Sequence, residues 1–275
     1  MPELPETETI ARDLDGAIRG RQIKKVSIRK SDVLREVSPR AFAKRLQNAT
    51  ILRSWRRAKL VVIDLESGDR VVVQPRFTGA LLIDDGHFHG DELKYSALRL
   101  ELDDGRALHY ADVRRLGTVA LMNRGRFEQY SARLGIEPLD RAFTPAHLSG
   151  VLRGTSQSVK KVLMEQRKIA GIGNIYANEA LWRARIDPSR PAASISLEEA
   201  SLLRTSIVDV LKEAIEARGT SFRDYRDARG QRGSFVEKLD VYGRGGLACR
   251  RCGSKLVATH AVDGRGTTMC VRCQH

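Results

Sequence analysis

The chain has 275 residues, of which 41% are hydrophobic and 30% charged, and its formal net charge is +14. This length is typical of about two domains with a proper core, and the composition is that of a soluble globular protein. The positive charge favours a polyanionic partner over the substrates of a generic metabolic enzyme, with solubility alone as the other explanation.

The first residues read MPELPE, and apolar residues then recur every four positions at Ile10, Leu14 and Ile18. This spacing predicts a helix over residues 5–18. If Met1 is removed, Pro2 becomes an N-terminal secondary amine, whose α-amino pKa is ordinarily about 7.7 to 8.0. Such an amine can attack a sugar aldehyde carbon and form an iminium ion, with Glu3 and Glu6 as candidate proton donor, acceptor or positioning group. The motif also fits an ordinary acidic helix start, so both interpretations stay open at this point.

From about residue 22 to residue 123 the apolar period changes to two. KLVVIDLESGDRVVVQP and ALRLELDDGRALHYADV each read as two strands joined by a turn. Repeated hairpins without long helices between them predict an antiparallel β-sandwich.

After residue 124 the period becomes helical. Short helices are predicted within TPAHLSGVLRG, SVKKVLMEQ and NIYANEALWRARI. A long helix is predicted over residues 196–218, with Ser196 and Glu199 as a capping box and Gly219 as its stop. The turn GIGN places backbone N–H groups and the Asn174 side chain at a helix N-terminus, which suits a phosphate, although a plain helix connection explains it equally well.

All the cysteines lie in the last part of the chain, where two C-x2-C pairs are separated by seventeen residues. This spacing fits one structural Zn²⁺ ion, bound by Cys249, Cys252, Cys270 and Cys273. Two disulfides are the alternative, and a reducing compartment disfavours them. The sequence between the pairs predicts a β-hairpin with Arg265 at its tip. From Arg218 onward there are twelve Lys and Arg against five Asp and Glu, so this region carries half of the net charge.

The predicted fold is therefore α+β and multidomain. We expect an N-terminal antiparallel β-sandwich with an N-terminal helix over residues 1–130, a helical domain over residues 131–235, and a C-terminal β-hairpin zinc finger over residues 236–275.

Together these landmarks resemble the formamidopyrimidine-DNA glycosylase family, which includes the endonuclease VIII branch. MPELPE is similar to the family's processed N-terminus, RRAKL to its strand lysine, DVRRLG to its void-filling loop and AGIGNIYANEALW to its helix-two-turns-helix motif. VYGR, the cysteine pairs and GRGTTMCVRCQ follow in the same order, so the resemblance covers essentially the whole length.

The resemblance implies a DNA repair enzyme that flips a damaged base out of the duplex, cuts its N-glycosidic bond and nicks the strand by β,δ-elimination. It assigns the nucleophile to Pro2, the acid/base to Glu3 and a supporting role to Glu6. Lys59 would assist β-elimination and Arg265 would grip phosphate in the second elimination. Without the family context, Lys59 would be a solvated strand end and Arg265 an exposed turn.

The resemblance also implies DNA contacts by Asn174, with Lys160 and Tyr242 as companions. The void left by the base would be filled from Phe77, Arg114 and Leu116, at positions where the family usually has Met, Arg and Phe. Tyr95 stands where many members have a DNA-contacting histidine. Because leucine cannot stack as an aromatic ring does, discrimination of the opposite base is in question.

The leucine in PELPE favours oxidised purines, 8-oxoguanine and formamidopyrimidines, and TSFRDYRDARGQRGSF is long enough to cover a flipped purine. An oxidised-pyrimidine glycosylase of the endonuclease VIII type is one alternative, and a catalytically silent zinc-dependent binder of damaged DNA is another. Double-stranded DNA with damaged bases is the expected partner, with no membrane association. A monomer is the default. Since no basic region followed by an apolar stretch opens the chain, we expect a bacterial cytoplasmic protein that associates with the nucleoid through DNA.

Overall fold

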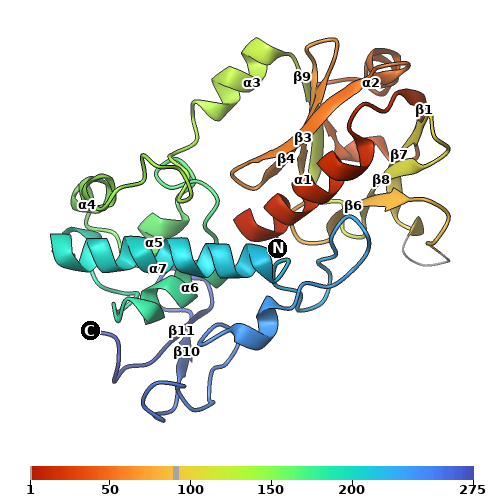
Figure 1. Cartoon of the computed structure of the whole chain (residues 1–275). Helices are drawn as coiled ribbons and strands as arrows, with labels where there is room; N and C mark the ends of the chain where they lie inside the picture. The colour runs from red at the N-terminus through yellow and green to blue at the C-terminus, as the bar shows by residue number, and fades with distance from the viewer. Residues whose placement is uncertain (1, 89–92) are drawn as a thin grey trace. The chain divides into compact units, whose positions relative to one another are not determined.

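The computed structural model describes residues 2–88 and 93–275 (Figure 1). The chain divides into two compact units. The first, called here the sheet unit, comprises the chain up to Ala132 together with Ile215–Val236, and the second, the helical unit, comprises Arg133–Ala214 and Glu237–His275. The three-domain division proposed from the sequence stays a prediction, but the contacts group residues 215–236 with the sheets.

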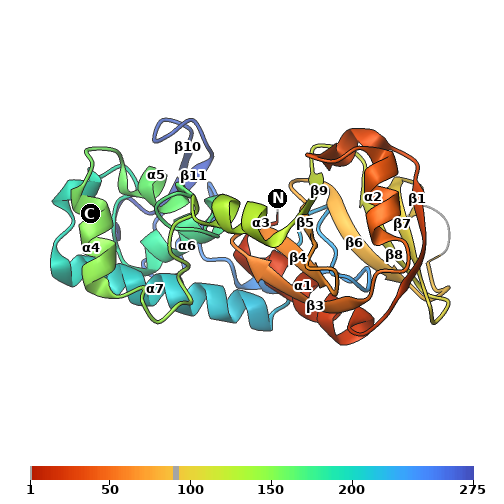
Figure 2. The same ribbon diagram turned by 90° about the horizontal axis from the view of Figure 1, so that it is seen from above.

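The sheet unit is a sandwich of two sheets (Figure 2). The four-stranded sheet has the order β1 (Ile23–Ile28), β7 (Ser96–Leu102), β8 (Ala107–Asp112) and β6 (Gly79–Asp84). The five-stranded sheet has the order β2 (Leu34–Arg35), β9 (Thr118–Met122), β5 (Arg70–Gln74), β4 (Leu60–Leu65) and β3 (Ile51–Arg57). Every pairing is antiparallel except that of the two-residue β2 with β9. The predicted sandwich is confirmed.

Helix α1 (Leu4–Ile18) packs against β3 and β4 and buries the residues that gave its predicted apolar stripe. Among residues 2–88 and 93–132, the structure has further helices that were not predicted, including η1 (Ser31–Val33), α2 (Pro39–Leu46) and α3 (Arg124–Ser131). They are short, and their apolar positions are too few to give a periodic signal. Phe42 of α2 is nevertheless fully buried in the core.

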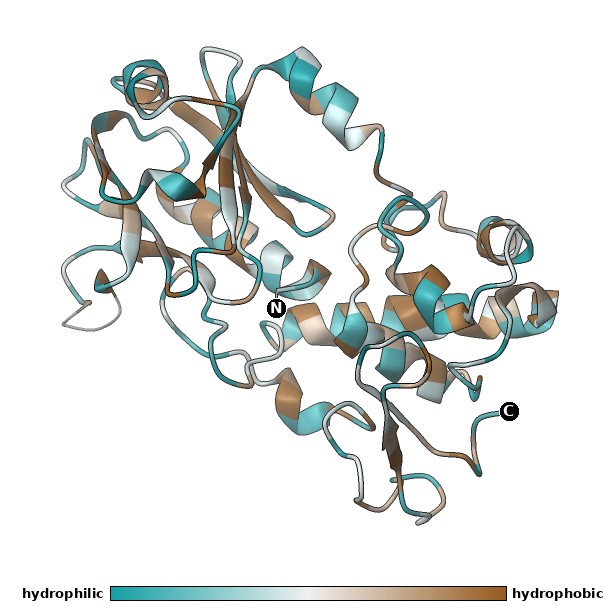
Figure 3. Cartoon of the chain, turned by 180° about the vertical axis from the view of Figure 1, so that it is seen from behind, coloured by the Kyte–Doolittle hydropathy of each residue, from teal (hydrophilic) through white to brown (hydrophobic). Residues whose placement is uncertain are grey.

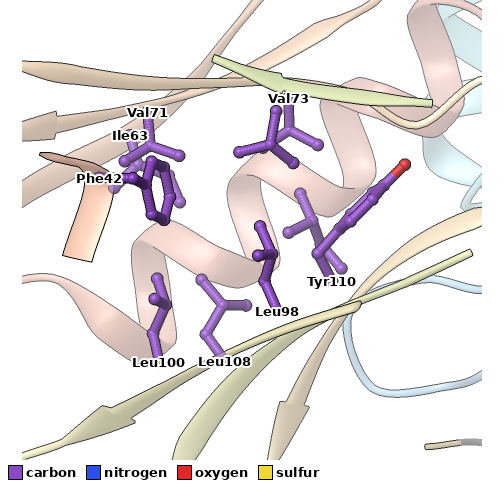
Figure 4. Close-up of a pocket in the computed structure, with 10 residues that line it drawn as sticks. Phe42, Ile63, Val71, Val73, Leu98, Leu100, Leu108 and Tyr110 are labelled. Atoms are coloured by element: carbon purple, nitrogen blue, oxygen red, sulfur yellow. The ribbon is translucent and has the colours of Figure 1, made fainter. Parts of the chain in front are cut away.

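A small cavity of about 20 Å³ lies between the two sheets (Figure 4). Its lining is apolar apart from the Tyr110 hydroxyl, with Ile63, Val71 and Val73 from one sheet and Leu98 among those from the other. A space this small and apolar belongs to the core and is not a ligand site.

The helical unit contains α4 (Pro145–Arg153), α5 (Val159–Met164), α6 (Asn174–Arg183), η3 (Ala192–Ser194) and most of α7 (Leu197–Glu216), and η4 (Phe235–Lys238) begins in the sheet unit. The predicted capping box of α7 is present: Glu199 N donates to Ser196 Oγ at 3.1 Å and Ser196 N to Glu199 Oε2 at 2.8 Å. A hairpin of β10 (Val257–Thr259) and β11 (Thr267–Met269) completes the unit.

Hydropathy follows these elements, with apolar residues concentrated along the strands and alternating with hydrophilic ones along the helices (Figure 3). Within the two described ranges, none of the helices combines the length and the apolar character needed to cross a lipid bilayer.

Candidate active site and nucleic-acid interface

The N-terminal turn of α1 is buried and held by one carboxylate. Pro2 and Glu3 are buried immediately before the helix, and Glu6 is 1% exposed. One oxygen of Glu6 accepts from Glu3 N at 2.8 Å, and the other accepts from Thr220 N at 2.8 Å. The backbone that presents Pro2 is therefore fixed to a segment more than two hundred residues away in the chain. Met1, and with it the expected processing of the N-terminus, lies outside the described residues.

Gly219 allows this arrangement. It has a φ of +86°, and a Cβ atom there would lie 2.9 Å from Glu6 Cγ and 3.0 Å from Tyr225 Cε1. The Tyr225 hydroxyl donates to the main-chain oxygen of Glu6 at 3.4 Å. Burial, and next the charge of Glu6, raise the pKa of Tyr225 well above its usual range, so the hydroxyl stays protonated as a donor.

Lys59 lies in the two-residue turn between β3 and β4, where Ala58 has a φ of +53°. The turn is tied to the first turns of α1. Thr7 Oγ1 donates to Ala58 O at 3.4 Å, and Arg56 Nε pairs with Glu8 Oε2 at 2.7 Å. The fold thus brings the turn that carries Lys59 beside the helix that follows Pro2, as a shared site requires.

Two exposed loops of the sheet unit are joined by Asp112, whose carboxylate is buried. Its Oδ1 accepts from Thr78 Oγ1 at 2.5 Å and from Arg114 N at 3.2 Å, and its Oδ2 accepts from Gly117 N at 2.8 Å. The loop after β5 and the loop after β8 are therefore joined into one platform.

This platform presents the side chains proposed to fill the void that a flipped nucleobase leaves. Phe77 is 46% exposed, and the Arg114 guanidinium lies over its ring at 5.2 Å. Leu116 is 39% exposed and Tyr95 is 45% exposed. Exposed large apolar side chains beside an arginine are suited to stacking on bases.

The four cysteine Sγ atoms lie within 4.8 Å of one another, and all four thiols are free of disulfides. Tetrahedral Zn²⁺ with Zn–S bonds of about 2.3 Å requires S···S separations of roughly 3.8 Å, so the cluster fits the ion. The predicted grouping of Cys249, Cys252, Cys270 and Cys273 is confirmed as a cluster that could hold a metal. Trp182 and Val241 pack against it.

The hairpin that carries Arg265 is anchored by side chains of α5 and α6. Lys160 Nζ donates to Thr267 Oγ1 at 2.7 Å and to Gly266 O at 3.2 Å, and Asn174 Nδ2 donates to Gly266 O at 2.9 Å. Lys160 is fully buried, which lowers its pKa, while Asp263 Oδ1 at 3.5 Å opposes that shift. The ammonium of Lys160 thus holds the hairpin in place, and the DNA contact expected for Lys160 from the family resemblance stays a prediction. Arg265 itself is exposed.

Glu179 of α6 fixes the backbone that precedes the cysteine cluster. Its buried carboxylate accepts from the backbone N–H groups of Asp240, Val241 and Tyr242, at 2.8, 3.0 and 2.7 Å. Burial raises the pKa of Glu179, and these three donors oppose the shift. Tyr242 is thereby held half-buried, shortly before the first cysteine of the cluster.

Sequence reasoning missed Asp112, Glu179 and Gly219 as organisers of the site. Only Asp112 had a local signal, because it is the first residue of the DVRRLG motif at the end of a strand. The partners of Glu179 and Gly219 are distant in sequence, so no spacing rule could reveal them.

The chain is similar to known proteins over its full length. Residues 1–119 match the formamidopyrimidine-DNA glycosylase N-terminal domain, and residues 134–226 match the formamidopyrimidine-DNA glycosylase H2TH domain. A formamidopyrimidine-DNA glycosylase of Heliobacterium modesticaldum is 41% identical, with 100% of both chains covered.

Two solved structures show the same fold. The MutM (Fpg) protein of Thermus thermophilus is 36% identical with a TM-score of 0.87, covering 99% of this chain and 98% of that one. The Lactococcus lactis Fpg (MutM) protein, in complex with DNA containing N7-benzyl-Fapy-dG, is 31% identical with a TM-score of 0.91 and 100% coverage of both chains. On this evidence the chain belongs to the formamidopyrimidine-DNA glycosylase family, a family of DNA glycosylases.

Proposed function

We propose that this protein is a bifunctional DNA glycosylase and AP lyase that removes oxidised purines, 8-oxoguanine and formamidopyrimidines, from duplex DNA. The observation that carries the proposal is the buried N-terminal turn, in which Glu6 fixes the backbone of Glu3 directly behind Pro2. A binding protein has no need to hold a secondary amine in this way.

In the proposed reaction the Pro2 nitrogen attacks C1′ of the damaged nucleotide while the glycosidic bond breaks and its electron pair leaves with the base. Glu3 protonates the ring oxygen, the sugar ring opens, and loss of the proton on nitrogen leaves a cationic iminium ion between Pro2 and C1′. The iminium acidifies the C2′–H bond, so loss of that proton breaks C3′–O and expels the first phosphate. In a second elimination, loss of the C4′ proton breaks C5′–O and expels the other phosphate.

Cations near the departing phosphates lower the cost of the charge that develops on them. Lys59 is suited to the first elimination because Thr7 ties its turn to α1. Arg265 is suited to phosphate contact because it is exposed at the tip of a hairpin that Lys160 and Asn174 anchor.

DNA is proposed to be held without sequence readout. Asn174, at the start of α6, and the half-buried Tyr242 are positioned to contact the backbone, and such contacts set register without specifying sequence. Phe77, Arg114 and Leu116 would occupy the void that the flipped base leaves, and the exposed Tyr95 would contact the DNA.

One Zn²⁺ ion is proposed to be bound by the four cysteines as a structural ion that supports folding of the hairpin. Its part in the reaction is indirect: Lys160 and Asn174 hold the same hairpin, so together they set where Arg265 stands.

The test compares single-turnover cleavage of duplexes with 8-oxoguanine or 5-hydroxycytosine, each opposite its normal partner, for wild type and Glu3→Gln. We expect faster cleavage at 8-oxoguanine, product ends carrying phosphate on both sides of the gap, and a rate at least roughly a hundredfold lower for Glu3→Gln. Faster cleavage at 5-hydroxycytosine would move the assignment to oxidised pyrimidines, and tight binding without cleavage of either would indicate a silent binder.

A further inference from the structure

The segment from Gly219 to Phe235, called here the covering loop, belongs to the sheet unit and is fixed to its sandwich. In the middle of the loop, Tyr225 and Ala228 pack in the core of the sandwich. Ala228 O also accepts from Ile83 N of β6 at 2.9 Å. Residues 222–224 between Ser221 and Tyr225 are exposed, and so are Arg229, Gln231, Arg232 and Ser234, so the loop is open to a ligand on both sides of its buried centre.

Arg218, directly before this loop, has an unusual backbone. Its φ is +60°, followed by +86° at Gly219. Left-handed conformation is rare for a residue with a long side chain, and it persists where surrounding contacts over-determine it.

Those contacts are two ion pairs. Arg218 Nη2 lies 2.6 Å from Asp13 Oδ2 of α1, and Arg218 Nε lies 3.0 Å from Asp227 Oδ2 of the covering loop. Both carboxylates are shielded from solvent, with side-chain exposures of 7% for Asp13 and 0% for Asp227. The guanidinium therefore joins the helix behind Pro2 to the loop, and although the Arg218 side chain itself is 39% exposed, it contacts both carboxylates on their shielded side.

Asp227 also holds the backbone of the residues that follow it in the loop. Its other oxygen accepts from Arg229 N at 2.9 Å and from Gln231 N at 2.8 Å, which closes a tight turn. If the guanidinium were removed, the buried carboxylate of Asp227 would keep only neutral donors.

We propose that Arg218 is a positioning residue that fixes the covering loop against α1 and thereby determines how efficiently the protein excises a damaged base. This inference rests on the proposed function, because it assumes that the loop contacts the damaged base during excision and takes no part in cleaving the strand. Helix α1 has its own anchor, since Ile10, Leu14 and Ile18 are fully buried. Loss of Arg218 would accordingly displace the part of the loop around Asp227 more than Thr220, whose N–H still donates to Glu6 behind Pro2.

The experiment uses Arg218→Gly, which removes the guanidinium and suits the left-handed backbone. The matched control is Arg185→Gly. Arg185 also has a φ of +60°, is exposed, and makes no ion pair within the described part of the chain. Both variants lose one positive charge and one side chain from the same backbone conformation. Asp13→Asn, alone and combined with Arg218→Gly, tests whether the two residues act together.

Each protein is assayed on a duplex with 8-oxoguanine and on a duplex with a preformed abasic site. We expect Arg218→Gly to lower excision of 8-oxoguanine about tenfold while nicking of the abasic site changes less than about twofold. Arg185→Gly is expected to match wild type on both, and adding Asp13→Asn to Arg218→Gly should cause little further loss. Equal losses on both substrates, or no loss on either, would overturn the inference.

Hydrogen exchange gives a readout that does not depend on activity. The amides of Arg229 and Gln231 should exchange about tenfold faster in Arg218→Gly than in wild type or Arg185→Gly. Unchanged protection of these amides would refute the positioning role. If wild type cleaves neither substrate, the proposed function fails, and the exchange result still decides whether Arg218 holds the loop.

Discussion

Replacing Gly219 with alanine tests the link between the covering loop and the N-terminal turn. The new Cβ atom would lie 2.9 Å from Glu6 Cγ and 3.0 Å from Glu6 Oε1, so the carboxylate must move. Glu6 then loses a good hydrogen bond to Thr220 N, to Glu3 N, or to both, each now 2.8 Å long.

The expected cost combines two contributions. A left-handed alanine costs about 1 kcal/mol relative to glycine, and losing one charge-assisted hydrogen bond costs about 2 kcal/mol. We therefore expect the free energy of unfolding to fall by about 3 kcal/mol, which corresponds to a drop in melting temperature of roughly 10 °C. Displacing the backbone at Glu3 should slow Schiff-base formation by Pro2 roughly a hundredfold, because positioning of the nucleophile is lost.

Gly20→Ala is the matched control. Gly20 ends α1 with a φ of +75°, and nothing lies within 4 Å of a Cβ atom there. It should lose only about 1 kcal/mol and no activity. Denaturant unfolding and the rate of borohydride trapping on a lesion duplex measure both effects. Equal trapping rates for the two alanine variants would show that the contact between Gly219 and Glu6 does not control the nucleophile.

Three further outcomes are expected. Asp112→Asn should weaken binding of a lesion duplex about tenfold in fluorescence anisotropy, since an amide cannot accept from all the donors that now join the two loops; unchanged affinity would remove Asp112 from the interface. Stripping the metal with a strong chelator should abolish DNA binding while circular dichroism shows the sheets intact, and full affinity after verified metal loss would contradict the role of zinc. Burial lowers the pKa of His109, so the folded protein binds fewer protons than the unfolded chain below about pH 6.5. The free energy of unfolding should therefore decrease as the pH falls through that window, and His109→Asn should flatten this slope; an equally steep slope in the variant would assign it to other groups.

Much of the fold could be predicted because its signals are local. The period-two strands, the capping box at Ser196 and the cysteine spacing each depend on residues close together in the sequence. Short helices such as α2 were missed because eight residues offer few apolar positions.

Organisation of the site was harder to predict because its contacts are long-range. Glu6 meets Thr220 across 214 positions, and Arg218 meets Asp13 across 205. The burial of Lys160 could not be predicted either, because lysine is almost always exposed, yet here the hairpin covers it. Residue types and their family likeness indicate the chemistry, whereas the fold decides which side chains face solvent.

The central claim is that the N-terminal amine of Pro2 bonds to the sugar. The most direct measurement is borohydride trapping of the Met1-processed protein on a duplex with 8-oxoguanine opposite cytosine, followed by mass spectrometry of the digested adduct. We predict that the DNA fragment is attached to the peptide that begins at Pro2, and that Pro2→Gly and Glu3→Gln sharply reduce its yield. An adduct on a lysine, or excision that proceeds with no trapped adduct, would contradict the account.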